Sequence, residues 1–247
     1  MSRQVPAATS TLRVLRYLSQ RSAPVPAARI AQDLGLPRST TYHLLTAMAT
    51  ESFVVHYPDD QRWGVGVAAW EVGQGYTRQA PLTRLARVPV QRLVDSLGLS
   101  AHLAVLLGAD VVYLVEERAA GRDQLVTDVG VRLPAHLTAS GRAILAGLTP
   151  AQVRTLYPSR AALVRRTEAG PRSLSELRTI LAATRRRGYA EEDSEVTEGF
   201  ASVAIGLRSP SNQAAVAVTW RTPLADDPEG VLERLRQAVA TIEARLR

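Results

Sequence analysis

Side chains that can hydrogen-bond nucleic acid gather in a short segment near the N-terminus. When residues 38–48 are placed on a helix, one face carries Arg38, Ser39, Tyr42, His43 and Thr46. No acidic residue occurs in this segment, and a carboxylate there would be repelled by phosphates. Guanidinium, hydroxyl and imidazole groups are donors and acceptors that contact bases and phosphates. The pattern predicts a DNA-binding surface, whereas its structural alternative is an ordinary solvated helix face.

The apolar residues around this face predict the elements that position it. One short helix before Gly35 buries Ile30, Ala31 and Leu34. A second helix buries Thr41, Leu44, Leu45 and Met48, which follow the i, i+3, i+4, i+7 pattern. Pro37 suits a first helical turn, where a missing N–H is tolerated. Two short helices joined by a glycine turn indicate a helix-turn-helix, whose second helix enters the major groove.

The flanking sequence extends this motif into a winged helix-turn-helix. A first helix is expected over 10–19, and apolar runs at 53–57 and 62–66 around a Pro-Asp-Asp turn indicate a β-hairpin. Arg62, near this wing, is placed to reach a minor groove or a phosphate. The predicted DNA-contacting residues are Arg29, Arg38, Ser39, Thr40, Tyr42, His43 and Arg62.

Composition narrows the class of protein. The 247 residues suit two domains, and the net charge of +7 is unevenly spread, because residues 1–50 hold six arginines and one acid. The sequence has no cysteine, which excludes disulfides and thiolate chemistry. We find no apolar run long enough for a membrane span and no apolar core of a signal peptide, so a cytoplasmic protein without membrane contact is expected.

The second half predicts an α+β domain with an antiparallel sheet. We expect domains at 1–66 and 81–247, joined by a linker helix at 67–80. Candidate strands lie at 102–107, 111–116, 124–129, 201–207 and 214–220. Two candidate helices lie at 82–97 and 138–148. Two more begin at the capping boxes Thr149–Gln152 and Ser173–Glu176, and a last one begins after Asp227. Gly188 is expected to end the helix that begins after Ser173.

Two clusters in this domain have alternative interpretations. Ala139, Ser140 and Gly141 open a helix, where backbone N–H groups can bind an anion, or where small side chains simply permit close packing. Arg142 is expected on the exposed side of that helix. The five acids in 191–198 can hold a cation or run acid–base chemistry, but a solvated loop after Gly188 is the simpler interpretation.

Three further motifs do not support a catalytic or metal site. Gly64-Val65-Gly66 imitates a dinucleotide fingerprint, but no parallel βαβ unit surrounds it. His102 and His136 lack metal-ligand spacing, so core or surface histidines are expected. Ser140 lacks the elbow of a serine nucleophile. No cofactor and no enzymatic activity are predicted.

The order of motifs resembles the IclR family of bacterial transcriptional regulators. The similarity lies in Ile30-Ala31, 35–40 and Leu44-Leu45, then in 134–146, 188–190 and 202–204. The resemblance implies a GAF-like C-terminal domain that binds a small organic acid, and a homodimer or homotetramer on operator DNA. It implies effector contacts at Ala139, Ser140, Gly141, Glu192 and Ser202. Glu192 and Ser202 depart from the aspartate and cysteine frequent in the family, and Arg208 replaces an aromatic or histidine.

These observations predict a ligand-responsive transcriptional regulator, specifically a repressor that binds a pseudo-palindromic operator. Two alternatives stay open from the sequence. One is a metabolite-converting enzyme with an accessory helix-turn-helix, and the other is an architectural DNA-binding protein without a ligand.

Overall fold

The chain forms two compact units, Met1–Ala80 and Pro81–Arg247, each with its own hydrophobic core. This computed structural model describes residues 5–79, 81–119, 121, 127–208, 213–223 and 227–246. Among them, no helix has the length and apolar character needed to cross a bilayer.

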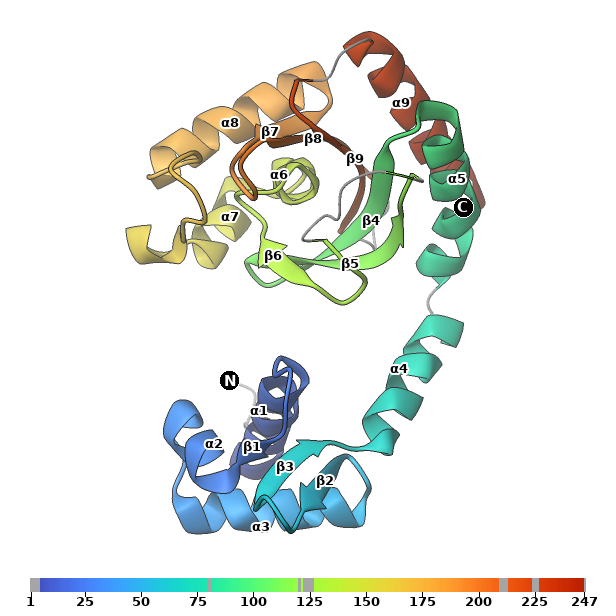
Figure 1. The fold of residues 1–247 in the computed structure, drawn as a ribbon. Helices are drawn as coiled ribbons and strands as arrows, with labels where there is room; N and C mark the ends of the chain where they lie inside the picture. Colours follow the sequence, from blue (N-terminus) through green and yellow to red (C-terminus); the bar gives the residue numbers. More distant parts are fainter. Residues whose placement is uncertain are drawn as a thin grey trace. The chain divides into compact units, whose positions relative to one another are not determined.

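The first unit is a winged helix-turn-helix (Figure 1). Its helices are α1 (Pro6–Ser19), α2 (Ala27–Leu34), α3 (Arg38–Thr50) and α4 (Val67–Gln79). Its antiparallel sheet, in the order β1-β3-β2, comprises β1 (Val25–Pro26), β2 (Val54–Tyr57) and β3 (Arg62–Val65). Helix α1 begins earlier than the predicted residue 10, because Pro6 is accommodated in its first turn.

The turn between α2 and α3 depends on Gly35, whose φ of 65° lies in the left-handed region. The N–H of Leu36 then donates to the Ala31 carbonyl at 2.9 Å and closes the end of α2. Pro37 is the residue before α3 rather than its first helical residue. Thr41 and Leu45 are buried as predicted, whereas Leu44 is only partly covered.

The second unit contains a six-stranded antiparallel sheet in the order β6-β5-β4-β9-β8-β7. The strands are β4 (Ser100–Leu107), β5 (Asp110–Glu117), β6 (Arg132–Pro134), β7 (Ala190–Asp193), β8 (Phe200–Gly206) and β9 (Ala214–Arg221). The helices are α5 (Pro81–Leu97), α6 (Ala139–Ala146), α7 (Pro150–Leu156), the 3₁₀ turn η1 (Arg160–Ala162), α8 (Leu174–Arg187) and α9 (Pro228–Leu246).

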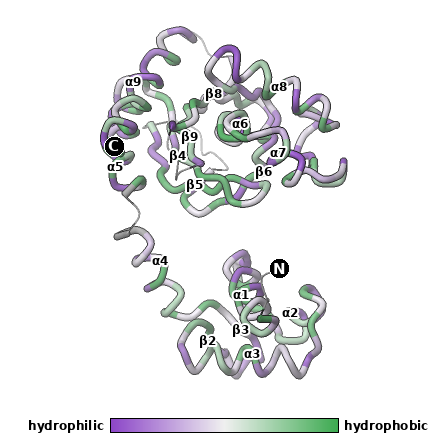
Figure 2. Tube along the Cα trace, turned by 180° about the vertical axis from the view of Figure 1, so that it is seen from behind, coloured by the Kyte–Doolittle hydropathy of each residue, from purple (hydrophilic) through white to green (hydrophobic). Residues whose placement is uncertain are grey.

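The two faces of this sheet have different coverings. Figure 1 shows the sheet curving around α6, with α5 and α9 on its outer face. Along β9, Val216 and Val218 point to the α5–α9 side, whereas Ala215 and Ala217 point to the α6 side. Hydrophobic segments accordingly concentrate in the central strands and in α6 (Figure 2). Alternation along the strands therefore produces one core on each side of the sheet.

Two predictions about this unit need correction in part. The predicted strand at 124–129 falls partly on residues outside the described ranges, and Thr127–Val129 form no strand. The acidic segment after Gly188 is only partly a loop, because residues 190–193 form the edge strand β7, whereas residues 194–199 are bends and turns. A short edge strand with three acids lacks the apolar alternation that identifies strands in sequence.

The local start and stop signals were correct. Thr149 and Gln152 form a reciprocal capping box at α7, and Ser173 accepts from the N–H of Glu176 at the start of α8. Gly188 ends α8 with a φ of 80°. These signals act within one turn of chain, so sequence alone reveals them.

Candidate functional site

The predicted DNA-contacting face lies on α3 and is exposed. Thr41, Leu45 and Met48 are buried on one side of the helix. The opposite side presents Arg38, Ser39, Thr40, Tyr42, His43 and Thr46 to solvent. Tyr42 is 50% exposed, which is high for a large aromatic side chain. The described part of α3 bears no carboxylate, so the face is polar and carries no negative charge.

Arg29, another predicted DNA contact, is already paired within the protein. Its Nε lies 2.9 Å from Asp33 Oδ1, and Tyr17 donates to Asp33 Oδ2 at 2.7 Å. The hydrogen bonds from Tyr17 and Arg29 hold the pKa of Asp33 below its usual range. Arg21 lies 3.6 Å from the same carboxylate, so the acid of this region is neutralised by its neighbours. Sequence reasoning did not foresee this pairing.

Arg62 begins β3 and is exposed at the wing. Its guanidinium Nη1 donates to the Pro24 carbonyl at 3.3 Å, which links the side chain to the residue before β1. Across the hairpin, the rings of His56 and Trp63 stack at 4.5 Å between centroids and stabilise the strand pair.

In the second unit, the predicted effector residues at the start of α6 have separate explanations. A Cβ on Gly141 would approach the Ala135 carbonyl oxygen to 2.1 Å, so close packing requires glycine there. Its N–H is also occupied, because Thr138 Oγ1 accepts from it. Ala139 packs against Ala204 and Ala217 of the sheet. Packing therefore accounts for the small size of both residues.

Ser140 differs from these neighbours. Its side chain is buried, and its hydroxyl oxygen has no hydrogen-bond partner among the described residues. A buried unpaired hydroxyl costs about 1–3 kcal/mol, so it marks a position where a ligand group or an ordered water is expected.

The other two predicted effector residues contact each other. Ser202 Oγ donates to Glu192 Oε1 at 2.7 Å and lies 2.9 Å from Thr219 Oγ1. Strand register aligns Glu192, Ser202, Thr219 and Ser100 across β7, β8, β9 and β4. All four are buried on the α6 face. We call these four residues the polar row; sequence reasoning missed Thr219 and Ser100, because register is not visible in sequence.

Burial raises the pKa of Glu192 from its ordinary 4.5 to about 7. The hydrogen bonds from Ser202 and from the Glu195 N–H oppose this shift, but desolvation is the larger effect. Glu192 therefore exchanges a proton near neutral pH.

Arg142 is buried, which corrects the expectation of an exposed side chain. Its Nε donates to the His136 carbonyl at 2.9 Å, and its Nη1 donates to the Glu191 carbonyl at 2.9 Å. Both terminal nitrogens also bind the carboxylate of Glu195. The sequence shows only a small-residue helix, whereas the folded chain places an acid 53 positions away beside this arginine.

A cavity of about 570 Å³ opens at the β7–β8 end of the sheet. Its lining includes Glu192, Ser202, Arg142 and Trp220, so it reaches two of the predicted effector residues. Ala139, Ser140 and Gly141 are not among its lining residues.

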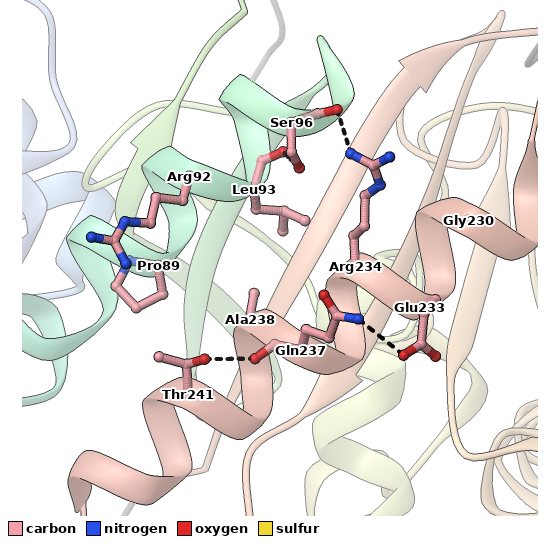
Figure 3. A pocket seen from close by; sticks show the side chains of 10 residues that line it. All are labelled: Pro89, Arg92, Leu93, Ser96, Gly230, Glu233, Arg234, Gln237, Ala238 and Thr241. Atoms are coloured by element: carbon pink, nitrogen blue, oxygen red, sulfur yellow. Dashed lines mark hydrogen bonds between the residues drawn. The ribbon is translucent and has the colours of Figure 1, made fainter.

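A second cavity, of about 540 Å³, lies between α5 and α9 on the outer face of the sheet. Figure 3 shows that several of its lining residues are hydrogen-bonded to one another. Arg234 donates to the Ser96 carbonyl at 2.7 Å, and Gln237 donates to Glu233 at 3.1 Å. The Arg234–Ser96 hydrogen bond joins α9 to α5, whereas the Gln237–Glu233 bond lies within α9.

The two histidines considered as metal ligands are buried core residues. His102 contacts the edge of the Tyr113 ring, and His136 contacts Tyr157 in the same manner. Within the described residues, no group of three or more histidine or acidic side chains is arranged to hold a metal ion.

A winged helix-turn-helix with an exposed polar helix face, followed by a separate α+β unit with buried polar groups, defines a DNA-binding transcriptional regulator. Family models agree with this class: residues 7–58 match the IclR helix-turn-helix domain, and residues 74–244 match the bacterial transcriptional regulator IclR C-terminal domain. The chain belongs to the IclR family.

Characterised relatives and solved structures are consistent with this assignment. The acetate operon repressor of Salmonella typhimurium is 31% identical over 89% of this chain and 81% of its own length. The transcriptional repressor IclR of Escherichia coli is 28% identical over 90% of this chain and 81% of its own length. An IclR regulator from Alicyclobacillus acidocaldarius has a TM-score of 0.83 at 22% identity, covering 98% and 99% of the two chains.

A further solved structure is an IclR homolog from Microbacterium hydrocarbonoxydans complexed with 4-hydroxybenzoate. Its TM-score is 0.79 at 24% identity, covering 98% of this chain and 99% of that one. The relatives are named as regulators and repressors of transcription, so the alternative of an enzyme with an accessory helix-turn-helix is not favoured.

Proposed function

We propose that this chain is a repressor that binds a pseudo-palindromic operator and is controlled by a small organic metabolite. The exposed, carboxylate-free face of α3 carries the DNA part of the proposal. A two-fold assembly would place two copies of this helix in successive major grooves, about 34 Å apart or a multiple of that distance. Such a regulator acts on the chromosome, which places it in the cytoplasm.

Each predicted DNA contact has a proposed role. Arg38 lies at the start of α3, where a helix in the major groove first meets bases or phosphates. Tyr42 and His43 follow one turn later on the same face. Arg62 extends the contact through the wing, and Arg29 contributes positive charge that is partly offset by Asp33. Ser39 and Thr40 supply hydroxyl groups near the helix start.

The effector part rests on buried polar groups in the second unit. Glu192 and Ser202 line a cavity large enough for a small metabolite, and Ser140 has an unsatisfied hydroxyl. Ala139 and Gly141 remain in the proposed effector set by family resemblance, but packing explains them already. A structural relative bound to 4-hydroxybenzoate supports a hydroxylated or carboxylated metabolite as the class.

Self-association is proposed through the linker helix at 67–80, between domains at 1–66 and 81–247. Helix α4 exposes Val67, Trp70, Val72 and Tyr76, each more than half accessible. Four large apolar side chains on one exposed helix favour burial against another copy. A homodimer is the minimal assembly that reads a palindrome, and a homotetramer would pair two such dimers.

Two substitutions, one in each unit, separate DNA binding from effector binding. We expect Arg38→Ala to weaken binding of the full chain to duplexes selected from a random library by at least ~10-fold. Arg178→Ala, an exposed arginine on α8, is the matched control and should leave DNA binding unchanged. Fluorescence anisotropy measures both.

The second substitution, Ser202→Leu, is expected to have the opposite effect. It places a large side chain in the polar row and leaves α3 unchanged. We expect it to keep DNA affinity while removing the thermal stabilisation that an effector from an organic-acid panel produces. Equal loss of both activities in Arg38→Ala and Ser202→Leu would contradict the division of labour between the two units.

A further inference from the structure

Two buried side chains on neighbouring strands of the second unit each have a polar atom without a hydrogen-bond partner among the described residues. His102 on β4 and Glu116 on β5 are directly paired across the two strands. His102 Nδ1 and Glu116 Oε2 lack hydrogen-bond partners among the described residues. Side chains opposite each other in an antiparallel pair share a face, with Cβ atoms about 5 Å apart. Both groups therefore face α6, beside the polar row.

Burial makes these two orphan atoms costly. The whole of His102 is 2% exposed, and the Glu116 side chain is 4% exposed. An unsatisfied buried polar atom costs about 1–3 kcal/mol, and more for a charged group. The other carboxylate oxygen of Glu116 has partners, because Oε1 accepts from Arg118 at 2.8 Å and from Thr127 at 3.1 Å. Among the described residues, Oε2 is the carboxylate oxygen of Glu116 that has no hydrogen-bond partner.

The chemistry of the two atoms restricts what can satisfy them. A carboxylate paired with an arginine only accepts hydrogen bonds, so Oε2 requires a donor. Burial lowers the pKa of His102 to about 4, so its imidazole is neutral at physiological pH and can donate or accept at Nδ1. A hydroxyl group both donates and accepts, so its chemistry matches the requirements of both atoms. A carboxylate cannot, because it has no proton to donate.

We propose that His102 and Glu116 form a subsite that receives a hydroxyl group of the effector, so that the regulator prefers hydroxylated over unsubstituted acids. This inference rests on the proposed effector function and names its ligand class. Position supports it: His102 is paired with Ala217, and Ala217 packs against Ala139 at the start of α6. The subsite therefore lies beside the helix end that carries the unsatisfied Ser140 hydroxyl.

The first test needs no effector and compares two buried histidines. His102 and His136 each contact a tyrosine edge-on, with centroids 4.7 Å and 5.4 Å apart. His136 also binds the Val164 carbonyl at 2.9 Å. We expect His102→Phe to leave the melting temperature of the full chain unchanged or higher, and His136→Phe to lower it by several degrees. Equal losses would mean that His102 is satisfied in solution, as by an ordered water, and would overturn the subsite.

The second test measures binding by calorimetry with probe pairs that differ by one hydroxyl: 4-hydroxybenzoate and benzoate, lactate and propionate, glycolate and acetate. We expect the full chain to bind the hydroxylated member of at least one pair ~10-fold or more tightly than its partner. His102→Phe and Glu116→Gln should bring this ratio towards one. Glu168→Gln, an exposed acid between η1 and α8, should leave it unchanged.

The outcomes separate the subsite from the effector function. Binding of both members of every pair with equal affinity would refute the subsite and leave effector control intact. If His102→Phe and Glu116→Gln kept the preference for the hydroxylated compound, the subsite would likewise be refuted and effector control would stand. Failure of all six compounds to bind would contradict the effector proposal, and the subsite with it.

Discussion

At the scale of single residues, burial changes the charge that Glu192 carries. Ser202 and the Glu195 N–H surround its carboxyl group, and desolvation brings its pKa to about 7. A metabolite that carries a negative charge would meet a neutral acid at slightly acid pH and a second anion above neutrality. Effector affinity and pH are therefore coupled at this residue.

The free energy of unfolding should depend on the ionisation of Glu192. The folded-state pKa lies above the ordinary value of 4.5, so the stabilising contribution is complete below that value and is lost as pH rises through about 7. Glu192→Gln cannot ionise. We expect its free energy of unfolding to gain about 2 kcal/mol relative to the wild type between pH 5 and pH 8.

Urea denaturation at the two pH values measures this difference. His102 titrates in the opposite sense, because burial lowers its pKa, but it is present in both proteins and cancels. Glu191→Gln is the neighbouring control, since Glu191 is exposed and paired with Arg187. A parallel pH dependence for the wild type and Glu192→Gln would refute the shift.

At the scale of elements, local signals determine helix ends, and packing determines the rest. The capping boxes at Thr149 and Ser173 and the stop at Gly188 were predictable, because each involves residues within one helical turn. Strand β7 was not predictable, because its acids hide the alternation of its inward residues Ala190 and Glu192. The burial of Arg142 depends on Glu195, a partner that only the folded chain brings close.

Helix α6 supplies an element-scale prediction. Gly141→Ala places a methyl group 2.1 Å from the Ala135 carbonyl oxygen, which forces the helix away from the preceding turn. We expect a loss of about 3 kcal/mol in unfolding free energy. Gly73→Ala in α4 is the control, because a Cβ there has no atom of the described residues within 4 Å. Equal stability of the two variants would show that Gly141 is not required by packing.

The predicted site was recovered to different extents in the two units. On α3, helical periodicity alone separates the exposed Arg38, Tyr42 and His43 from the buried Thr41 and Leu45. In the second unit, Glu192 and Ser202 were named by resemblance, and the structure brings them into contact. Their row partners on β9 and β4 required strand register, which depends on the whole sheet.

At the scale of the whole molecule, charge distribution governs the encounter with DNA. The net charge is +7, and residues 1–50 contribute six arginines against one acid. We expect affinity for a selected duplex to fall by about 10³-fold between 50 and 200 mM salt, because phosphate binding releases counterions. Arg38→Ala should reduce the slope of log affinity against log salt by about one if Arg38 contacts a phosphate.

The same titration with Arg178→Ala controls for net charge, because this variant loses one positive charge away from α3. An affinity that is insensitive to salt would argue strongly against DNA binding through this unit.

One patch of the contact between α6 and the sheet consists of methyl groups, those of Ala139, Ala143, Ala204 and Ala217. Alanine has no side-chain rotamers, so no side chain within this patch can change its conformation when the start of the helix is pushed. A molecule that docks at the start of α6 must therefore shift the helix as a rigid rod or leave it in place. Such an all-or-none response is suited to switching a gene rather than grading its output.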